Sequence, residues 1–337
     1  MRQVFITRHG APEVLQVRES DDPVAGEGQV RIRVKAAGIN FADLMARMGL
    51  YPEAPKPPCV IGYEVSGELD QLGEGVVGFS LGERVFGMPR FGGYTDCIVL
   101  PATNVLKMPA KMTFEQAAAL PVVSLTAHHM MLGNGNLRRN SKVLIHSAAG
   151  GVGLAAIQIA KTRDCEIIGI ASANKHEFLR SLGVQHCVDA AGELVPQVRA
   201  IVGDAGVDLV LDPVGGRSWA DGFSLLAPAG RLVCFGFSAA VGGEKRSIFR
   251  ALMAFLRVPK WSPMQLMESN RTVSGTNMLA LMDQLDLLIP QFEELIAMFD
   301  SGQLDPRVDK AFPFAEAAAA HQYLHDRKAK GKVLLVP

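Results

Sequence analysis

The clearest hydrophobic pattern along the chain lies between Lys142 and Lys161, where two apolar runs flank a cluster of glycines. The first run, Val143 to Ile145, is typical of a parallel strand that is covered on both faces. The glycines allow a sharp turn and a close approach of the backbone to a ligand. The second run predicts an apolar helix. A buried strand, a glycine turn and a helix in direct succession indicate a dinucleotide-binding site.

Short segments with the pattern of strands dominate the chain up to about Pro121, and Gly and Pro clusters separate them. This pattern predicts a β-rich, barrel-like unit. The segment from Tyr51 to Pro58 carries four prolines, so we expect a loop of restricted shape there. The strands expected in this unit are Val30–Val34, Val60–Leu69, Arg84–Phe86 and Tyr94–Leu100.

The pattern changes near Thr113, where Thr113, Glu115 and Gln116 predict the start of a helix. From there apolar strands alternate with helical stretches, which predicts an α/β fold with a doubly wound parallel sheet. The tail predicts a helix near Phe314–Arg327 and a last strand at Lys332–Val336. The strands expected in the sheet are Val143–His146, Glu166–Ala171, Val207–Leu211, Arg231–Phe235 and Thr272–Thr276.

Composition excludes some functions. A chain of 337 residues corresponds to about two domains. It has 34 basic and 34 acidic side chains, and this balance argues against a nucleic-acid partner. The N-terminal segment has no targeting pattern and no run of about 18 apolar residues occurs, so we expect a cytoplasmic protein. Five cysteines, an odd count without a C-x-x-C pair, indicate reduced thiols.

The glycine cluster is the first candidate site. The helix N-terminus that follows it would point its unpaired N–H groups at the phosphates of a dinucleotide. The first position of the G-x-G-x-x-G pattern is Ala148, so by spacing alone an ordinary tight strand-to-helix turn remains open. The residues of the expected backbone contact are Ala149, Gly150, Gly151 and Val152.

Motifs along the whole chain resemble those of one family. In order, they are PVAGEGQVRIRVKAAGINFADLMARMGLYP, GYEVSG, GERV, SAAGGVG, DPVGG and GKVLLVP. Together they resemble the medium-chain dehydrogenase/reductase superfamily, and specifically its zinc-free quinone oxidoreductase branch. Within that branch, ASANKHEFLRSLGV and NRTVSGTNM are most similar to the vesicle amine transport protein subfamily.

The resemblance implies a fold and a reaction. The fold would be a GroES-like β-rich substrate domain, residues 1–122 and 300–337, with a Rossmann dinucleotide-binding domain, residues 123–299, inserted into it. The reaction would use NADPH to reduce quinones or α,β-unsaturated carbonyls in a cleft between the domains. The resemblance also implies a homodimer that pairs through an edge strand of the Rossmann sheet, here Thr272–Thr276.

Zinc is not expected. Alcohol dehydrogenases of this superfamily bind catalytic zinc through a cysteine and a histidine, at positions that resemble Asn40 and Tyr63 here. Glu64 remains, but one carboxylate without thiolate or imidazole partners does not make a tetrahedral zinc site. The four-cysteine lobe of structural zinc is missing as well. His128 and His129 are adjacent, and neighbouring helical residues do not face one ligand.

The end of the second sheet strand predicts the choice of nicotinamide cofactor. NAD-preferring sites place Asp or Glu there to hold the ribose hydroxyls, whereas this chain has Ala171 and Ser172. A 2′-phosphate could instead contact Ser172 and Asn174 and be neutralised by Lys175. The alternative is that Lys175 only caps a solvated helix start. Related quinone reductases often contact the phosphate through a tyrosine, and Ala190 stands at that position, which weakens the prediction of NADPH.

Hydride transfer needs alignment, a dry pocket and a donor to the developing oxyanion. Asn40 could donate from its amide, and Tyr51 could donate a proton or stack on a flat substrate. Asn and Asp also commonly hold turns through their own backbone, and Asp43 in particular could do only that. The residues that the resemblance places around the nicotinamide or the substrate are Asn40, Asp43, Tyr51, Tyr63 and Thr126.

Two later segments are also candidates. Phe235, Gly236 and Phe237 end a strand at the carboxyl edge of the sheet, where ligands of such folds bind, and are expected to shape the cofactor pocket. The segment from Glu244 to Lys260 combines five basic residues with apolar positions. Such a segment can be a packed helix, a lid over an apolar cleft, or a basic amphipathic helix on an anionic membrane.

These observations predict an NADPH-dependent, zinc-free oxidoreductase of the NADPH:quinone oxidoreductase type, or an enone reductase. The proton would come from solvent or from Tyr51, although a tyrosine with an ordinary pKa near about 10 is a poor source of it. The alternative from another class is an NADPH-binding, membrane-associated or regulatory binding module with weak or no turnover. The substrate itself is not predictable, because one fold accepts many electrophiles.

Overall fold

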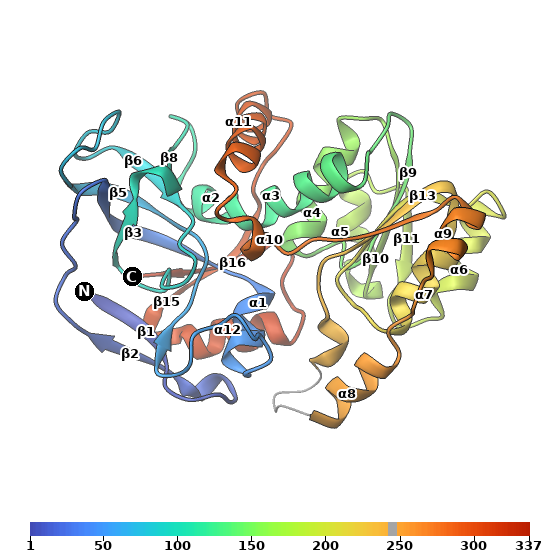
Figure 1. Cartoon of the computed structure of the whole chain (residues 1–337), viewed down its shortest axis with the longest axis horizontal. Coiled ribbons are helices and arrows are strands. Elements are labelled where there is room, and N and C mark those ends of the chain that lie inside the picture. The colour runs from blue at the N-terminus through green and yellow to red at the C-terminus, as the bar shows by residue number, and fades with distance from the viewer. Residues whose placement is uncertain (242–247) are drawn as a thin grey trace. The chain divides into compact units, whose positions relative to one another are not determined.

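The computed structural model describes residues 1–241 and 248–337, and the side chains of residues 242–251 lie outside this description. The chain forms two compact units (Figure 1). Of the described residues, 1–123 and 305–337 belong to the first unit, and 124–241 and 248–304 belong to the second. The two ends of the chain therefore fold together in the first unit.

Strands form the frame of the first unit. Their bounds are β1 Arg2–Ile6, β2 Leu15–Glu19, β3 Gln29–Ile39, β4 Cys59–Val60, β5 Val65–Leu72, β6 Arg84–Gly87, β7 Cys97–Pro101, β8 Val105–Lys107, β15 Val308–Pro313 and β16 Lys332–Val336. The larger sheet has the order β15-β16-β3-β5-β6-β8, with β7 paired to β3, and the smaller has the order β2-β1-β4. The predicted strand Val60–Leu69 divides into β4 and β5, because Gly62 has a φ of 102° and interrupts it.

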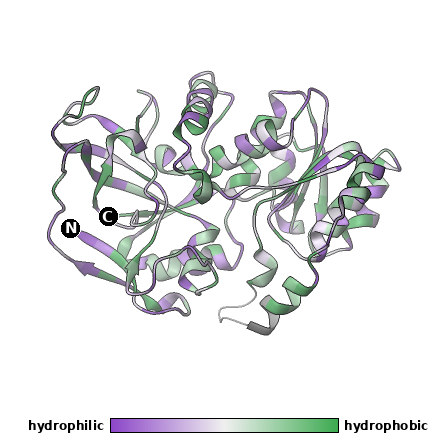
Figure 2. Cartoon of the chain, in the orientation of Figure 1, coloured by the Kyte–Doolittle hydropathy of each residue, from purple (hydrophilic) through white to green (hydrophobic). Residues whose placement is uncertain are grey.

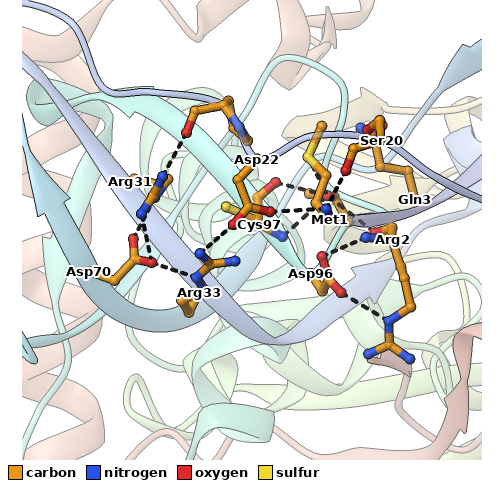
Figure 3. A network of polar contacts seen from close by, with 12 residues as sticks. Met1, Arg2, Gln3, Ser20, Asp22, Arg31, Arg33, Asp70, Asp96 and Cys97 are labelled. Carbon is orange, nitrogen blue, oxygen red and sulfur yellow. Dashed lines mark hydrogen bonds and ion pairs between the residues drawn. The ribbon is translucent and has the colours of Figure 1, made fainter.

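Strand β3 serves two environments at once. Val30 and Ile32 are fully buried in the core, whereas successive side chains of a strand point to opposite faces. On the other face Arg31 and Arg33 both donate to Asp70 of β5, at 2.8 and 2.5 Å (Figure 3). We call this set the Asp70 network. It ties neighbouring strands together at the surface of the unit.

A helix, α1 (Phe41–Arg47), follows β3 directly. Only strands and turns are predicted in this part of the chain, and that expectation is wrong here. The helix has a recognisable start signal, because Asn40 is its N-cap and Asp43 accepts a hydrogen bond from the Asn40 N–H at 2.7 Å. The other helices of this unit are α2 (Phe114–Ala119), which begins where predicted, and α12 (Ala317–His325).

The second unit is a six-stranded sheet in which every pair of neighbours is parallel. Its strands are β9 Lys142–Ile145, β10 Glu166–Ala171, β11 His186–Asp189, β12 Val207–Asp212, β13 Leu226–Cys234 and β14 Thr272–Gly275. The order β11-β10-β9-β12-β13-β14 is that of a doubly wound fold, which binds ligands outside the carboxyl ends of the strands where the order reverses. Strand β11 is not predicted, because His186 and Asp189 make it too polar for the pattern.

Helices complete the second unit. Their bounds are α4 Gly151–Lys161, α5 His176–Ser181, α6 Leu194–Val202, α7 Arg217–Ser224, α8 Ile248–Leu256, α9 Pro263–Ser269, α10 Met278–Leu281 and α11 Leu285–Asp300, and α3 (Pro121–His128) begins in the first unit and ends in the second. The candidate segment Glu244 to Lys260 lies partly outside the described residues, and its described part holds the mostly hydrophobic α8 (Figure 2). Within the described ranges, no helix is long and apolar enough to cross a membrane.

Candidate functional site

The glycine turn connects the carboxyl end of β9 to the first turn of α4, and the four residues predicted for pyrophosphate all lie in it. Gly150 is the N-cap of α4 and no side chain caps this end, so the first N–H groups of the helix are open to an anion. A Cβ at Gly153 would lie 2.6 Å from the backbone of Ala148. Only glycine therefore lets α4 pack this closely on the end of the strand.

The groups predicted for a 2′-phosphate follow β10 in a short 3-10 helix. Ser172 donates to the Asn174 side chain at 2.7 Å. Lys175 is only 8% exposed, which differs from the solvated lysine considered as the alternative. The Ala190 N–H donates to the Ala171 carbonyl at 3.0 Å, so Ala190 does lie beside the end of β10. This end of the sheet offers a hydroxyl, an amide and an ammonium group.

A buried carboxylate that sequence analysis missed orders the loop after β12. Asp212 is fully buried and accepts the N–H of Val214 and the hydroxyl of Ser218, both at 2.6 Å. Gly215, in the same loop, has a φ of 86°, and a Cβ there would lie 2.2 Å from the ring of Phe237. The predicted Phe237 is thus packed against a loop that needs glycine. The only sequence signal for Asp212 is its place in the DPVGG motif.

Three polar side chains meet in the core of the first unit, and we call them the Lys332 triad. Lys332 Nζ lies 2.5 Å from Glu64 Oε1 and donates to Asn40 Oδ1 at 2.5 Å. Asn40 Nδ2 donates to the same Glu64 oxygen at 2.8 Å. The exposed fractions are 3% for Lys332, 0% for Glu64 and 8% for Asn40. Buried charges persist when they are paired and hydrogen-bonded, and this triad meets both conditions.

A second polar cluster lies around Asp43. Burial raises the pKa of Asp43 to about 7, although the Asn40 N–H that it accepts lowers the pKa. The nearby Tyr94 hydroxyl lies 3.1 Å from His321 Nε2. Arg47, one helical turn after Asp43, is fully buried, and its guanidinium has no hydrogen-bond partner within the described ranges. Asp43 therefore holds the start of α1 and titrates near neutral pH.

The two tyrosines predicted at the substrate lie next to one another. The rings of Tyr51 and Tyr63 meet edge-on with centroids 6.5 Å apart, and Tyr63 also packs against Phe91. Burial raises the pKa of Tyr51 to about 12, so the ordinary value assumed from sequence is wrong. Burial also raises the pKa of Tyr63. Both phenols are poor proton sources, but their hydroxyls can donate hydrogen bonds.

The residues at the positions of zinc ligands do not fit a metal ion. Asn40 and Glu64 turn oxygen atoms toward the Lys332 ammonium, which would repel a second cation at the same place. Tyr63 would have to give up a proton that burial makes harder to remove. Within the described part of the chain, no three His, Cys, Asp or Glu side chains converge on a metal position.

The predicted residues divide between the units. Thr126 lies in α3 and is 7% exposed. The structure adds Lys332, Glu64 and Asp212 as buried polar groups at these sites, and a lysine before the apolar run of β16 was the one signal that could have found the triad. Predicted residues in the first unit are Asn40, Asp43, Tyr51 and Tyr63, and those in the second are Thr126, Ala149, Gly150, Gly151, Val152, Ser172, Asn174, Lys175, Phe235, Gly236 and Phe237.

Each unit supplies a different chemistry. The second unit can hold a pyrophosphate at the N-terminus of α4 and offer positive charge beyond β10. The first unit offers uncharged donors, the Asn40 amide within the Lys332 triad and the Tyr51 hydroxyl beside the Tyr63 ring. Donors of this kind stabilise an oxygen that gains negative charge without transferring a proton to it.

Comparison with known proteins shows the family to which the chain belongs. Residues 26–110 match the alcohol dehydrogenase GroES-like domain family, and residues 182–335 match the zinc-binding dehydrogenase family. The synaptic vesicle membrane protein VAT-1 homolog of Rattus norvegicus is 39% identical over 325 residues, which cover 96% of this chain and 80% of the relative. The quinone oxidoreductase of Pseudomonas aeruginosa is 31% identical over 340 residues, covering 100% and 99% of the two chains.

Solved structures agree as well. The crystal structure of Escherichia coli quinone oxidoreductase complexed with NADPH has a TM-score of 0.88 to this chain at 29% identity, with 100% of both chains covered. The predicted GroES-like and Rossmann fold is confirmed, and so is the family resemblance seen in the motifs. The chain therefore belongs to the medium-chain dehydrogenase/reductase superfamily of NAD(P)-dependent oxidoreductases, among the quinone oxidoreductases and VAT-1 homologues.

Proposed function

We propose that the protein uses NADPH to reduce quinones or α,β-unsaturated carbonyls, and that it does so without zinc. The observation that carries the proposal is the glycine turn, because the uncapped N-terminus of α4 at Gly150 suits a pyrophosphate. The NADPH bound to the Escherichia coli neighbour supports the same cofactor. Zinc independence is supported by the Lys332 ammonium, which lies where Asn40 and Glu64 would otherwise face a metal.

The preference for NADPH over NADH follows from the groups after β10. Ser172 and Asn174 bring polar atoms to this edge without a carboxylate that would repel a phosphate. Lys175 adds the positive charge that a 2′-phosphate needs. The position of Ala190 beside Ala171 leaves these three side chains as the proposed phosphate contacts.

The roles of the first unit follow from donor chemistry. Bound NADPH would supply a hydride, which the acceptor takes at carbon while negative charge grows on its oxygen. Asn40 suits that oxygen, because only one of its two Nδ2 hydrogens has an acceptor among the described residues. Tyr51 can donate a hydrogen bond or stack on the acceptor. Since the pKa of Tyr51 is raised to about 12, solvent is the better source of the proton that completes the reduction.

Steady-state oxidation of NADPH against a panel of quinones and enones tests the proposal. We expect turnover with at least one acceptor, faster with NADPH than with NADH at limiting concentrations. Elemental analysis and chelation provide the test for zinc, and we expect neither stoichiometric metal nor a loss of rate. Inactivity across the whole panel would contradict the proposed reaction, and stoichiometric zinc would contradict the proposed chemistry.

A second candidate function is a nucleotide-binding module that contacts membranes peripherally. Exposed apolar side chains favour it, since Phe255 and Leu256 of α8 are 68% and 67% exposed and Met264 and Met267 of α9 are 57% and 66% exposed. Exposed apolar groups of this kind can insert at a lipid interface. Co-sedimentation with anionic vesicles tests it. Vesicle binding that Phe255→Ser abolishes, together with NADPH binding but no turnover, would favour this function over the reductase.

We also propose that the protein is a homodimer that pairs through β14. This strand ends the order of the described sheet and has a strand neighbour only in β13, so its outer edge can pair with a second copy. Light scattering of the purified protein tests this. A monomer at concentrations of tens of micromolar would contradict it.

A further inference from the structure

Lys332 opens β16 and is almost completely buried, with 3% of its surface exposed. It meets Asn40 although the two residues are 292 positions apart in the chain. A lysine ammonium has three N–H donors and no acceptor. Its two neighbours, Asn40 Oδ1 and Glu64 Oε1, must therefore both act as acceptors.

This restriction fixes the orientation of the Asn40 amide together with the Glu64 carboxylate, which can only accept hydrogen bonds. With Oδ1 turned toward Lys332, Nδ2 faces Glu64 and donates to Oε1 at 2.8 Å. The second Nδ2 hydrogen has no acceptor in the part of the chain that the structure describes. Asn40 is also the most exposed member of the triad, at 8%. The buried ammonium thus fixes Oδ1 of the amide, and one Nδ2 hydrogen has no acceptor among the described residues.

Glu64 extends the same arrangement to α3. Its other oxygen, Oε2, accepts the Val122 N–H at 2.8 Å, in the first turn of that helix. A carboxylate is favoured at this place, because the N–H groups of a first helical turn lack helical acceptors. One ammonium on β16 therefore holds both the Asn40 amide and, through Glu64, the start of α3.

We propose that Lys332 is a positioning residue of the reduction, which sets the direction in which Asn40 presents its free amide N–H to the hydride acceptor. This rests on the proposed function, because that function assigns Asn40 to the acceptor. Lys332 is assigned a positioning role because its ammonium contacts Asn40 and Glu64 directly.

The first test is Lys332→Met, which keeps the apolar stem and removes all three donors. We expect kcat with an accepted quinone to fall about 10- to 100-fold, toward the lower end of what loss of a preorganised donor costs. The KM for NADPH should stay within about threefold. The matched control is Lys35→Met, because Lys35 of β3 pairs with Glu68 of β5 at 3.2 Å but is 45% exposed. This control should leave kcat unchanged.

Combining Lys332→Met with Asn40→Ala separates positioning from a general structural effect. If Lys332 acts through Asn40, Lys332→Met should lower kcat less than about twofold in the Asn40→Ala background, because interacting residues are not additive. Losses that multiply would overturn the proposal. So would parent-like kinetics in a folded Lys332→Met variant.

The side-chain amide signal of Asn40 gives a readout that does not depend on turnover. In the ¹⁵N-labelled parent we expect one sharp pair of Nδ2 resonances, assigned by its loss in Asn40→Asp, and in Lys332→Met a broadened or doubled pair. An unchanged pair would overturn the positioning role whether or not the parent reduces any quinone. An inactive parent that shows the expected change would overturn only the proposed function.

A double variant covers the case in which Lys332→Met does not fold because Glu64 is left buried without its cation. Lys332→Met with Glu64→Gln removes both charges and places a new amide, which accepts the Val122 N–H through its oxygen and therefore turns its NH2 group toward Asn40. Asn40 must then rotate its amide so that Oδ1 accepts from this NH2 group, which reverses the direction of Nδ2 relative to the parent. We expect a folded protein whose kcat stays about 10- to 100-fold below that of the parent, and a folded double variant with parent-like kcat would overturn the proposal.

Discussion

The first unit holds two polar networks that differ mainly in their access to water. In the Asp70 network, Arg31 and Arg33 share one carboxylate and the three side chains are 18–39% exposed (Figure 3). In the Lys332 triad, the ammonium and the carboxylate of Glu64 are 3% and 0% exposed. The shortest contact distances are alike, 2.5–2.8 Å in both. Any difference in how much the two networks contribute to the free energy of unfolding therefore comes from their exposure to solvent rather than from their contact distances.

Carboxyl groups in the two surroundings show what solvent does. Burial alone would raise the pKa of Asp70, but hydrogen bonds from Arg31 and Arg33 bring it below the ordinary value. Asp43, close to the triad, has its pKa raised to about 7 because burial outweighs its hydrogen bond from Asn40. Pairing dominates near the surface and desolvation dominates in the core. Water can replace a lost partner only at the surface, so the buried network should tolerate far less change.

The largest expected effect comes from breaking the buried network. Glu64→Leu removes the carboxylate that pairs with the buried Lys332 ammonium and accepts the Val122 N–H, and we expect the free energy of unfolding to fall by about 3–5 kcal/mol. The matched change four residues later, Glu68→Leu in β5, removes the exposed partner of Lys35 and should cost less than about 1 kcal/mol. Urea unfolding measures both. Equal losses would remove the distinction between the two networks.

The next effect concerns pH. A carboxyl whose pKa is about 7 in the folded protein and 3.8 ordinarily binds its proton more tightly in the folded state, so Asp43 makes stability fall as the pH rises from about 4 to about 7. Asp43→Asn cannot titrate but keeps an oxygen for the Asn40 N–H. We expect its free energy of unfolding to decline less than that of the parent across this window. Parallel pH profiles would show that Asp43 does not titrate there.

Lys175 extends the comparison to a buried lysine whose proposed partner is a ligand. Lys175→Ala should narrow the difference in affinity between NADPH and NADH by about tenfold or more, because a charge-assisted contact to phosphate contributes about 1.5–3 kcal/mol. Fluorescence titration with both cofactors measures it. The control is Lys161→Ala, at the exposed C-terminal end of α4. Equal affinities in the parent, or an unchanged ratio in the variant, would refute the assignment.

The smallest effect is expected at Tyr51, a residue that is neither exposed nor fully buried. Tyr51→Phe removes only the hydroxyl and should lower kcat less than about tenfold, because a phenol with a pKa of about 12 is a poor acid and solvent can supply the proton. Tyr51→Ala should mainly raise the KM of the acceptor through lost stacking. Steady-state kinetics of both variants with an accepted quinone measure these changes in kcat and KM. A loss of several hundredfold in Tyr51→Phe would make the hydroxyl an obligatory acid.

Local sequence patterns were sufficient to predict elements whose residues are neighbours both in sequence and in space. The turn from β9 to α4 follows from apolar runs and glycines that lie within a few residues of each other, whereas the edge position of β14 was implied by the family resemblance. Helix α1 was missed because its signal, Asn40 with Asp43, is only four residues long and follows directly on a strand. Strand β11 was missed because a short polar strand has no clear alternation.

The sequence predicted individual residues of the candidate site but not their contacts or burial. Asn40 and Tyr51 were expected near the acceptor, yet their surroundings were not, and the pKa of Tyr51 was assumed to be ordinary. Lys332 had no predicted role, since nothing near it in sequence indicates a partner. Burial and pairing of charged groups depend on chain segments that only the sheet order brings together.

By itself, the sequence determined the glycine turn and the alternation of strands and helices, because each is set by residue type and local spacing. The family resemblance added that cysteine and histidine are absent from the zinc positions. Tertiary structure alone decided that β16 lies beside β3 and so places Lys332 against Asn40 across 292 positions of chain. It also decided that Asp43 and Tyr51 are desolvated enough for their pKa values to rise. Electrostatic energies depend on the distances between charges and on the exclusion of water. Neither quantity can be obtained from the order of the residues alone.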